Sequence, residues 1–167
     1  MKKLYMKQKV FSWKEHFTVK DEQEEDCYIV EGDAVVVGGK KLHIRDTSGI
    51  EVAMIQQKLL SLRPRFFVYI RGEQVAEIVK KISLFKPKYM IAGPDWEVKG
   101  SIFEHDYAIT DQDGEVARLH KVWLSWGDSY ELSIADRVDE KMVLAVVLAI
   151  DCVLEAQAES AAAADVE

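Results

Sequence analysis

The fold is indicated by three stretches that repeat one pattern: GIEVAMI at 49–55, GEQVAEI at 72–78 and GEVARL at 114–119. Each begins with a glycine, continues through one or two polar-leaning positions and ends in Val-Ala-x-Ile or Val-Ala-x-Leu. Each is followed, at a similar distance, by a lysine and then a serine. Self-similarity on this scale is typical of a repeated supersecondary unit, so the architecture is best inferred from the repeat before any single segment.

A short strand pattern follows each copy of the repeat. Residues 66–70, 89–91 and 130–134 each open with an aromatic side chain and continue with period two, which places aromatic and aliphatic groups on one face of a strand. Two similar segments, 42–46 and 107–111, each lead into an Asp-x-x-Gly sequence, the composition of a tight turn. From about residue 4 to about residue 135, the sequence pattern predicts about a dozen short strands joined by turns. Such a succession is typical of an antiparallel barrel or sandwich.

The character of the sequence changes after Asp136. Residues 142–154 are apolar on every side apart from Asp151, and the acidic Asp139 and Glu140 stand where a helix cap and first turn favour negative charge. A helix without a polar face must be enclosed by apolar surroundings. At about 1.5 Å per residue the apolar stretch spans only about 20 Å, less than the roughly 30 Å hydrocarbon core of a membrane.

The strands and the helix together predict a mainly β fold. We expect a closed antiparallel β-barrel of about twelve strands around a central C-terminal hydrophobic α-helix. A single domain should cover residues 1–155, with the helix at about 140–155. The acidic and alanine-rich tail at 156–167 is expected to be disordered.

These motifs, taken in order, resemble the LURP-one-related (YxjI-like) family, which shares its Tubby C-terminal-like fold with the phospholipid scramblases. The resemblance extends from about Tyr5 to Leu154 and rests on the Lys-x-x-Ser strand openings, the Asp-x-x-Gly turns, the Val-Ala repeats and the final apolar helix. It implies a twelve-stranded barrel threaded by a helix, and no particular reaction. Tubby domains bind phosphoinositide head groups and scramblases act on membranes, but their phosphoinositide, calcium and palmitoylation motifs are not found in this sequence.

Length, composition and charge exclude several classes of protein. The 167 residues are 49% hydrophobic and 31% charged, as in one globular domain. A net charge of -7 gives the whole molecule no electrostatic reason to bind nucleic acid. Cys27 and Cys152 form no CxxC pair. Lys7 and Lys9 interrupt the apolar run that a signal peptide would need, so we expect a cytoplasmic protein.

The sequence shows no catalytic constellation, and we expect no enzyme activity, no metal and no cofactor. Ser125 lacks the Gly-x-Ser-x-Gly elbow of hydrolases, and the four histidines form no HxH or HExxH pair. A metal site is a minor alternative near His105 and Asp106. Residues 111–115, DQDGE, resemble the start of a calcium loop but lack its later ligands, so a turn is favoured.

The remaining signal is a basic segment in an otherwise acidic protein. The loops Arg63-Pro64-Arg65 and Lys86-Pro87-Lys88 are equivalent in the repeat and should project from one end of the barrel. Lysines and arginines in such loops can hold a phosphate or an anionic head group through charge-assisted hydrogen bonds. The candidate ligand-binding residues are Lys58, Arg63, Arg65, Lys86 and Lys88.

Several functions remain open at this point. The first is a non-enzymatic binding or scaffold module that recognises an anionic ligand such as a phospholipid head group and lies peripherally on an anionic membrane. The second is a protein-protein interaction module without a small-molecule ligand. The basic loops can also be solvated tips that keep sheet edges from pairing, and an enzyme remains only if a deep polar pocket gathers histidines and carboxylates that are distant in the sequence.

Overall fold

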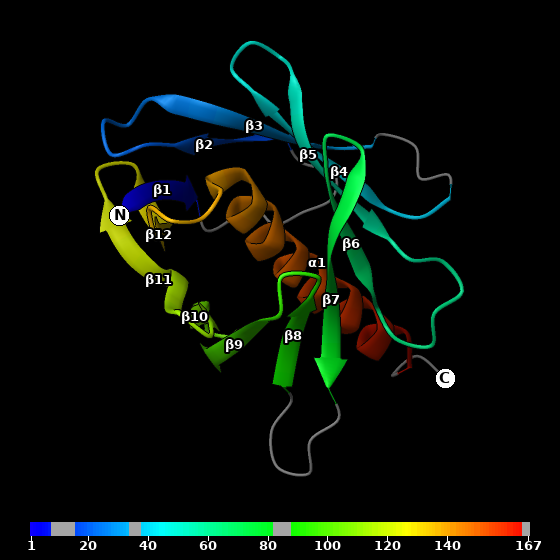
Figure 1. Ribbon diagram of the computed structural model, residues 1–167. Helices are drawn as coiled ribbons and strands as arrows, with labels where there is room; N and C mark the ends of the chain where they lie inside the picture. Colours follow the sequence, from blue (N-terminus) through cyan, green and yellow to red (C-terminus); the bar gives the residue numbers. More distant parts are fainter. Residues whose placement is uncertain (8–15, 34–37, 82–87, 165–167) are drawn as a thin grey trace.

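The chain folds into a closed β-barrel with a C-terminal helix inside it (Figure 1). The computed structural model describes residues 1–7, 16–33, 38–81 and 88–164. Its twelve strands are antiparallel, each pairs with its neighbours in the sequence, and β1 pairs with β12 to close the barrel. The predicted fold class is confirmed. The elements are β1 (Lys2–Lys7), β2 (Phe17–Lys20), β3 (Asp26–Gly32), β4 (Lys41–Asp46), β5 (Glu51–Gln57), β6 (Phe66–Ile70), β7 (Glu73–Lys81), β8 (Lys88–Ala92), β9 (Trp96–Ser101), β10 (Asp106–Asp111), β11 (Gly114–Leu124), β12 (Gly127–Ile134) and α1 (Glu140–Ala164).

The three repeats quoted above are the sites of β-bulges. In the β4–β5 hairpin, Ile44 pairs with Ala53 and Arg45 with Glu51, so Val52 is an extra residue without a partner. The same shift of register occurs in the β6–β7 and β10–β11 hairpins. A bulge interrupts the alternation of a strand, so the valine and the following alanine both pack toward the core. The bulge residues are Val52, Val75 and Val116.

Helix α1 occupies the inside of the barrel, and its residues from Val143 to Val153 are all buried. Its start is fixed by polar contacts. The Oδ1 atom of Asp139 accepts a hydrogen bond from the backbone N–H of Lys141 at 3.0 Å, which caps the helix. Glu140 accepts a hydrogen bond from the Tyr28 hydroxyl of β3 and pairs with Lys2 of β1 at 2.9 Å.

The helix is longer than expected, because it continues past 155 to Ala164 instead of giving way to a disordered tail. Residues from Ala158 onward are exposed, and the run of alanines at 161–164 favours helix without needing burial. Two contacts tie this segment to the barrel: Lys40 pairs with Glu159 at 2.6 Å, and Tyr89 donates to Gln157 at 3.3 Å. Within the described chain, no helix is both long enough and apolar enough to cross a membrane.

The helix defines two ends of the barrel. At the entry end, where α1 begins, lie the β2–β3, β4–β5, β6–β7 and β10–β11 turns. At the exit end, where α1 leaves, lie the β5–β6 loop, the end of β3 with the start of β4, and the end of β7 with the start of β8 (Figure 1). This division follows from the topology, since successive hairpins of an antiparallel meander turn at alternate ends.

Leu148→Asp should prevent folding, because Leu148 is fully buried on the helix and a carboxylate there would be desolvated without a partner. The expected cost is on the order of 5 kcal/mol, against a total stability of roughly 5–15 kcal/mol for a natural domain. Ala161→Asp, at the exposed end of the same helix, is the matched control. Thermal unfolding followed by circular dichroism measures both, and a Leu148→Asp protein that melts like wild type would place the helix outside the barrel.

Candidate functional site

The β5–β6 loop (58–65) carries three of the five candidate ligand-binding residues. Lys58 and Arg63 are exposed, and Arg65 is half-buried. The backbone N–H of Lys58 donates to the Arg65 carbonyl at 2.8 Å, and the Lys58 ammonium lies 5.7 Å from the centre of the Phe67 ring. The base of the loop is therefore closed by a backbone hydrogen bond, and Arg63 extends from its exposed part.

The guanidinium of Arg65 is already occupied. Its Nε and Nη2 atoms both contact the carboxylate of Glu77 on β7, and the Glu77 side chain is only 17% exposed. An arginine paired with a carboxylate in this way offers little net charge to a ligand. Arg65 thus fixes the loop to the barrel wall, whereas neither Lys58 nor Arg63 forms a salt bridge within the part of the chain that the structure describes.

Of the two remaining candidates, the structure places Lys88, which lies at the same end of the barrel. Lys88 is exposed at the start of β8, where it pairs in register with Lys81 at the end of β7. Lys86 lies outside the described residues. Because β5–β6 and β7–β8 are alternate hairpins of one meander, Lys58, Arg63 and Lys88 all lie at the exit end of the barrel.

The β5–β6 loop (58–65) also exposes three leucines, which the sequence pattern did not mark as candidates. Leu60 and Leu62 are both fully exposed, and Leu59 is 53% exposed. Leu60 also has a left-handed backbone, with φ of 55°, which a leucine adopts at some energetic cost. The sequence held one sign of this exposure. Three leucines lie between Lys58 and Arg63 in a predicted turn region, where no strand pattern would direct their side chains into the core.

A second polar cluster lies inside the barrel around Asp151 of α1. Asp151 is 4% exposed, and burial raises the pKa of its carboxyl while the nearby His105 opposes that rise. The Nε2 atom of His105, in the β9–β10 turn, lies 3.0 Å from Asp151 Oδ1, and its ring stacks on Tyr130 at 4.7 Å. Burial, and secondarily Asp151, raises the pKa of Tyr107, whose hydroxyl has no hydrogen-bond partner in the described part of the chain.

This cluster differs from the metal site considered as an alternative. His105 faces Asp151 rather than its neighbour Asp106, which is exposed at the start of β10. Among the described residues, no group of three or more histidine, cysteine or carboxylate side chains is placed to hold a metal ion. The DQDGE segment forms the expected turn, with Asp111 accepting the Asp113 N–H at 2.9 Å and pairing with Arg137 at 2.7 Å.

The family model described as LURP-one-related matches residues 2–151, from the first strand of the barrel to the buried aspartate of the helix. The chain belongs to the LURP-one-related family. A relative from Bacillus subtilis (strain 168), named "Uncharacterized protein YxjI", is 40% identical over 154 residues, which cover 92% of this chain and 94% of the relative. The predicted family is therefore confirmed.

The LURP-one-related barrel also has a structural neighbour in plants. An X-ray structure of a protein from Arabidopsis thaliana superposes with a TM-score of 0.64 at 18% identity, covering 91% of this chain and 90% of the other. At that identity the likeness establishes the fold alone. For this LURP-one-related protein, binding partners must therefore be argued from its own residues. Packing does not explain the exposed leucines and cations of the β5–β6 loop or the buried Asp151.

Asp151→Asn should raise the stability of the protein, and by more at pH 8 than at pH 5. The folded-state pKa of Asp151 is raised, so the wild-type protein loses stability as pH rises through that pKa, and an amide does not. The gain expected at pH 8 is about 1–3 kcal/mol, or roughly 2–10 °C in melting temperature. Differential scanning fluorimetry across this pH range provides the measurement.

His105→Asn is the opposing variant for that experiment. Asparagine tolerates the left-handed backbone of this position, where φ is 53°, but it removes the imidazole beside Asp151. The melting temperature should fall, because the buried carboxylate loses its closest partner. If Asp151→Asn is less stable than wild type at pH 8, the pair with His105 stabilises the fold and the argument from desolvation is wrong.

Proposed function

We propose that this protein is a non-enzymatic binding module that docks on anionic membrane surfaces through its β5–β6 loop. One observation carries the proposal: Leu60 and Leu62 are fully exposed at the tip of a loop flanked by Lys58 and Arg63, two exposed cations without a salt bridge to any described residue. Apolar side chains at a tip with cations beside them suit the boundary between acyl chains and phosphate head groups.

Both parts of the loop are needed on energetic grounds. Full burial of one leucine side chain is worth about 1.5–3 kcal/mol, and insertion at an interface realises only part of that. Each lysine or arginine close to an anionic surface adds about 1 kcal/mol. Two leucines together with Lys58, Arg63 and Lys88 reach the range of a single lipid anchor, which gives reversible binding with a constant of about 10⁴ per molar.

The charge distribution favours one orientation. The protein as a whole carries a net charge of -7, so an anionic bilayer repels most of its surface. Lys58 and Arg63 of the β5–β6 loop and Lys88 at the start of β8 are exposed and stand at one end of the barrel. An approach with this exit end toward the membrane brings Leu60 and Leu62 to the lipid and keeps the acidic remainder in water.

Arg63→Ala combined with Lys88→Ala should weaken binding to vesicles of phosphatidylcholine with 30% phosphatidylserine about ten-fold or more, because two favourable charge contacts of about 1 kcal/mol each are lost. Co-sedimentation at low and at physiological salt measures the binding, which should fall as salt rises. The matched control is Lys99→Ala combined with Lys121→Ala, two exposed lysines on β9 and β11. Equal binding by both double variants would contradict the proposal.

Leu60→Ser combined with Leu62→Ser should abolish sedimentation with the same vesicles while leaving the melting temperature unchanged, since neither side chain packs in the folded protein. Ile50→Ser removes an exposed apolar side chain from the β4–β5 turn at the entry end and serves as control. If the wild-type protein does not sediment with anionic vesicles at low salt, the membrane proposal is refuted. The leucines would then mark the contact surface for a protein partner.

A further inference from the structure

Ser61 is a polar residue at the tip of the β5–β6 loop, where it stands between Leu60 and Leu62. Both leucines are fully exposed, and Ser61 itself is partly exposed. The Ser61 hydroxyl forms no hydrogen bond with another described residue. The serine that follows the first Val-Ala repeat therefore presents a nucleophilic oxygen on a projecting loop, with no partner in the part of the protein that the structure describes.

Two comparable serines elsewhere in the barrel are engaged by carboxylates. Ser125 follows the third Val-Ala repeat, and its Oγ atom donates a hydrogen bond to Glu24 at 2.8 Å. Ser48 is exposed in the β4–β5 turn, and its Oγ atom donates a hydrogen bond to Asp46 at 2.6 Å. Chemical modification of either hydroxyl would break a hydrogen bond that the fold already makes. Ser61 carries no such cost.

Cations flank Ser61 on both sides in the sequence KLLSLR at 58–63. Lys58 stands three residues before the serine and Arg63 two residues after it, and both are exposed. The next cation, Arg65, is paired with Glu77 and holds the end of the loop to the barrel. Protein kinases select their substrates partly by charge, and a substrate groove with acidic subsites favours lysine or arginine on either side of the serine. The loop has the charge pattern that such a groove recognises.

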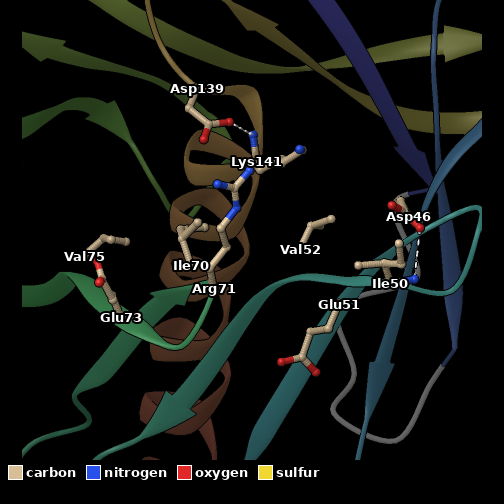
Figure 2. Close-up of a pocket in the computed structure, with 10 residues that line it drawn as sticks. All are labelled: Asp46, Ile50, Glu51, Val52, Ile70, Arg71, Glu73, Val75, Asp139 and Lys141. Atoms are coloured by element: carbon tan, nitrogen blue, oxygen red, sulfur yellow. Dashed lines mark hydrogen bonds between the residues drawn. The ribbon is translucent and has the colours of Figure 1, made fainter.

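The surroundings of Ser48 at the entry end have the opposite charge. A cleft of about 650 Å³ opens there between the β4–β5 and β6–β7 hairpins, where strands β5 and β6 part. Four carboxylates and two cations line this cleft (Figure 2). Ser48 stands in the turn between Asp46 and Ile50, two of the lining residues. A kinase groove that selects cations is disfavoured there, so Ser48 is a matched serine in unfavourable surroundings.

We propose that Ser61 is a phosphorylation site, and that a phosphate there releases the β5–β6 loop from anionic membranes. A protein kinase with acidic subsites catalyses the transfer, and magnesium-bound ATP is the phosphoryl donor. A bond forms between Ser61 Oγ and the γ-phosphorus, while the bond from that phosphorus to the β–γ bridging oxygen breaks. ADP leaves, and the hydroxyl proton passes to the catalytic base of the kinase. The modification depends only on the loop itself, whereas its effect rests on the membrane docking proposed above.

A phosphate on Ser61 changes both interactions that the loop can make with a bilayer. Phosphoserine carries about -1.5 to -2 charges at pH 7, which offset the two positive charges of Lys58 and Arg63. The Arg63 guanidinium can also bind the phosphate through charge-assisted hydrogen bonds instead of a lipid head group. Leu60 and Leu62 flank the serine, so their insertion would draw the phosphate out of water at a high energetic cost. Attraction to the surface and insertion into it are therefore both lost.

Labelling of the full chain tests the site without any membrane. The protein is incubated with labelled ATP and the catalytic domain of protein kinase C, which accepts basic residues on both sides of a serine, and peptide mass spectrometry locates the phosphate. Ser61→Ala should lose most of the label, whereas Ser48→Ala should keep it. Lys58→Gln combined with Arg63→Gln should slow labelling of Ser61 about ten-fold or more. Phosphate that is absent from Ser61, or a Ser61→Ala protein labelled like wild type, overturns the site.

Sedimentation with the phosphatidylserine vesicles described above tests the effect. Phosphorylated protein should bind about thirty-fold more weakly than unmodified protein, as for the loss of two cation contacts. Ser61→Glu should also weaken binding, whereas its uncharged counterpart Ser61→Gln and the entry-end variant Ser48→Glu should bind like wild type. If the phosphorylated and unmodified proteins bind equally well, the release is wrong and the docking stands. If unmodified protein does not bind, docking and release both fail, and the labelling alone decides whether Ser61 is a phosphorylation site.

Discussion

Helix α1 has no polar side to turn toward water between Val143 and Ile150, and the rest of the architecture follows from that constraint. A single sheet face cannot cover a helix that is apolar all round, but a closed sheet can. The twelve strands supply that closure, and their alternating inward side chains form one continuous core with the helix. Polar contacts confined to the two ends, such as Asp139 at the start and Lys40 with Glu159 near the finish, fix its position.

Departures from regular structure in this barrel are local and ordered. The Val-Ala repeats place bulges in hairpins that turn at the entry end, and two of those bulges border the cleft between β5 and β6. Asp151 is the polar exception in the buried stretch of the helix from Val143 to Val153, and His105 from a turn with a left-handed backbone contacts it. A buried carboxylate or a left-handed backbone lowers the stability of the fold relative to regular packing. Positions that keep such a feature are therefore candidates for a functional role.

The two ends of the barrel differ in chemistry. The exit end presents leucines and cations on a loop, a surface suited to an extended interface such as a bilayer. The entry end presents a cleft of about 650 Å³ that charged residues of both signs and a few aliphatic side chains line together. Both ends are built by the same antiparallel meander, because its successive hairpin turns lie alternately at the entry end and at the exit end.

Periodicity, the Val-Ala repeats and the apolar helix determined the closed barrel, its strand number and its family, since these depend on which side chains must be buried. The sequence also placed Arg63 and Lys88 in equivalent connections. It did not reveal that Glu77 neutralises Arg65, that Leu60 and Leu62 stay exposed, that His105 reaches Asp151, or that Arg71 and Lys141 share a cleft. Those facts depend on register, turn geometry and the meeting of distant segments, which only the tertiary structure decides.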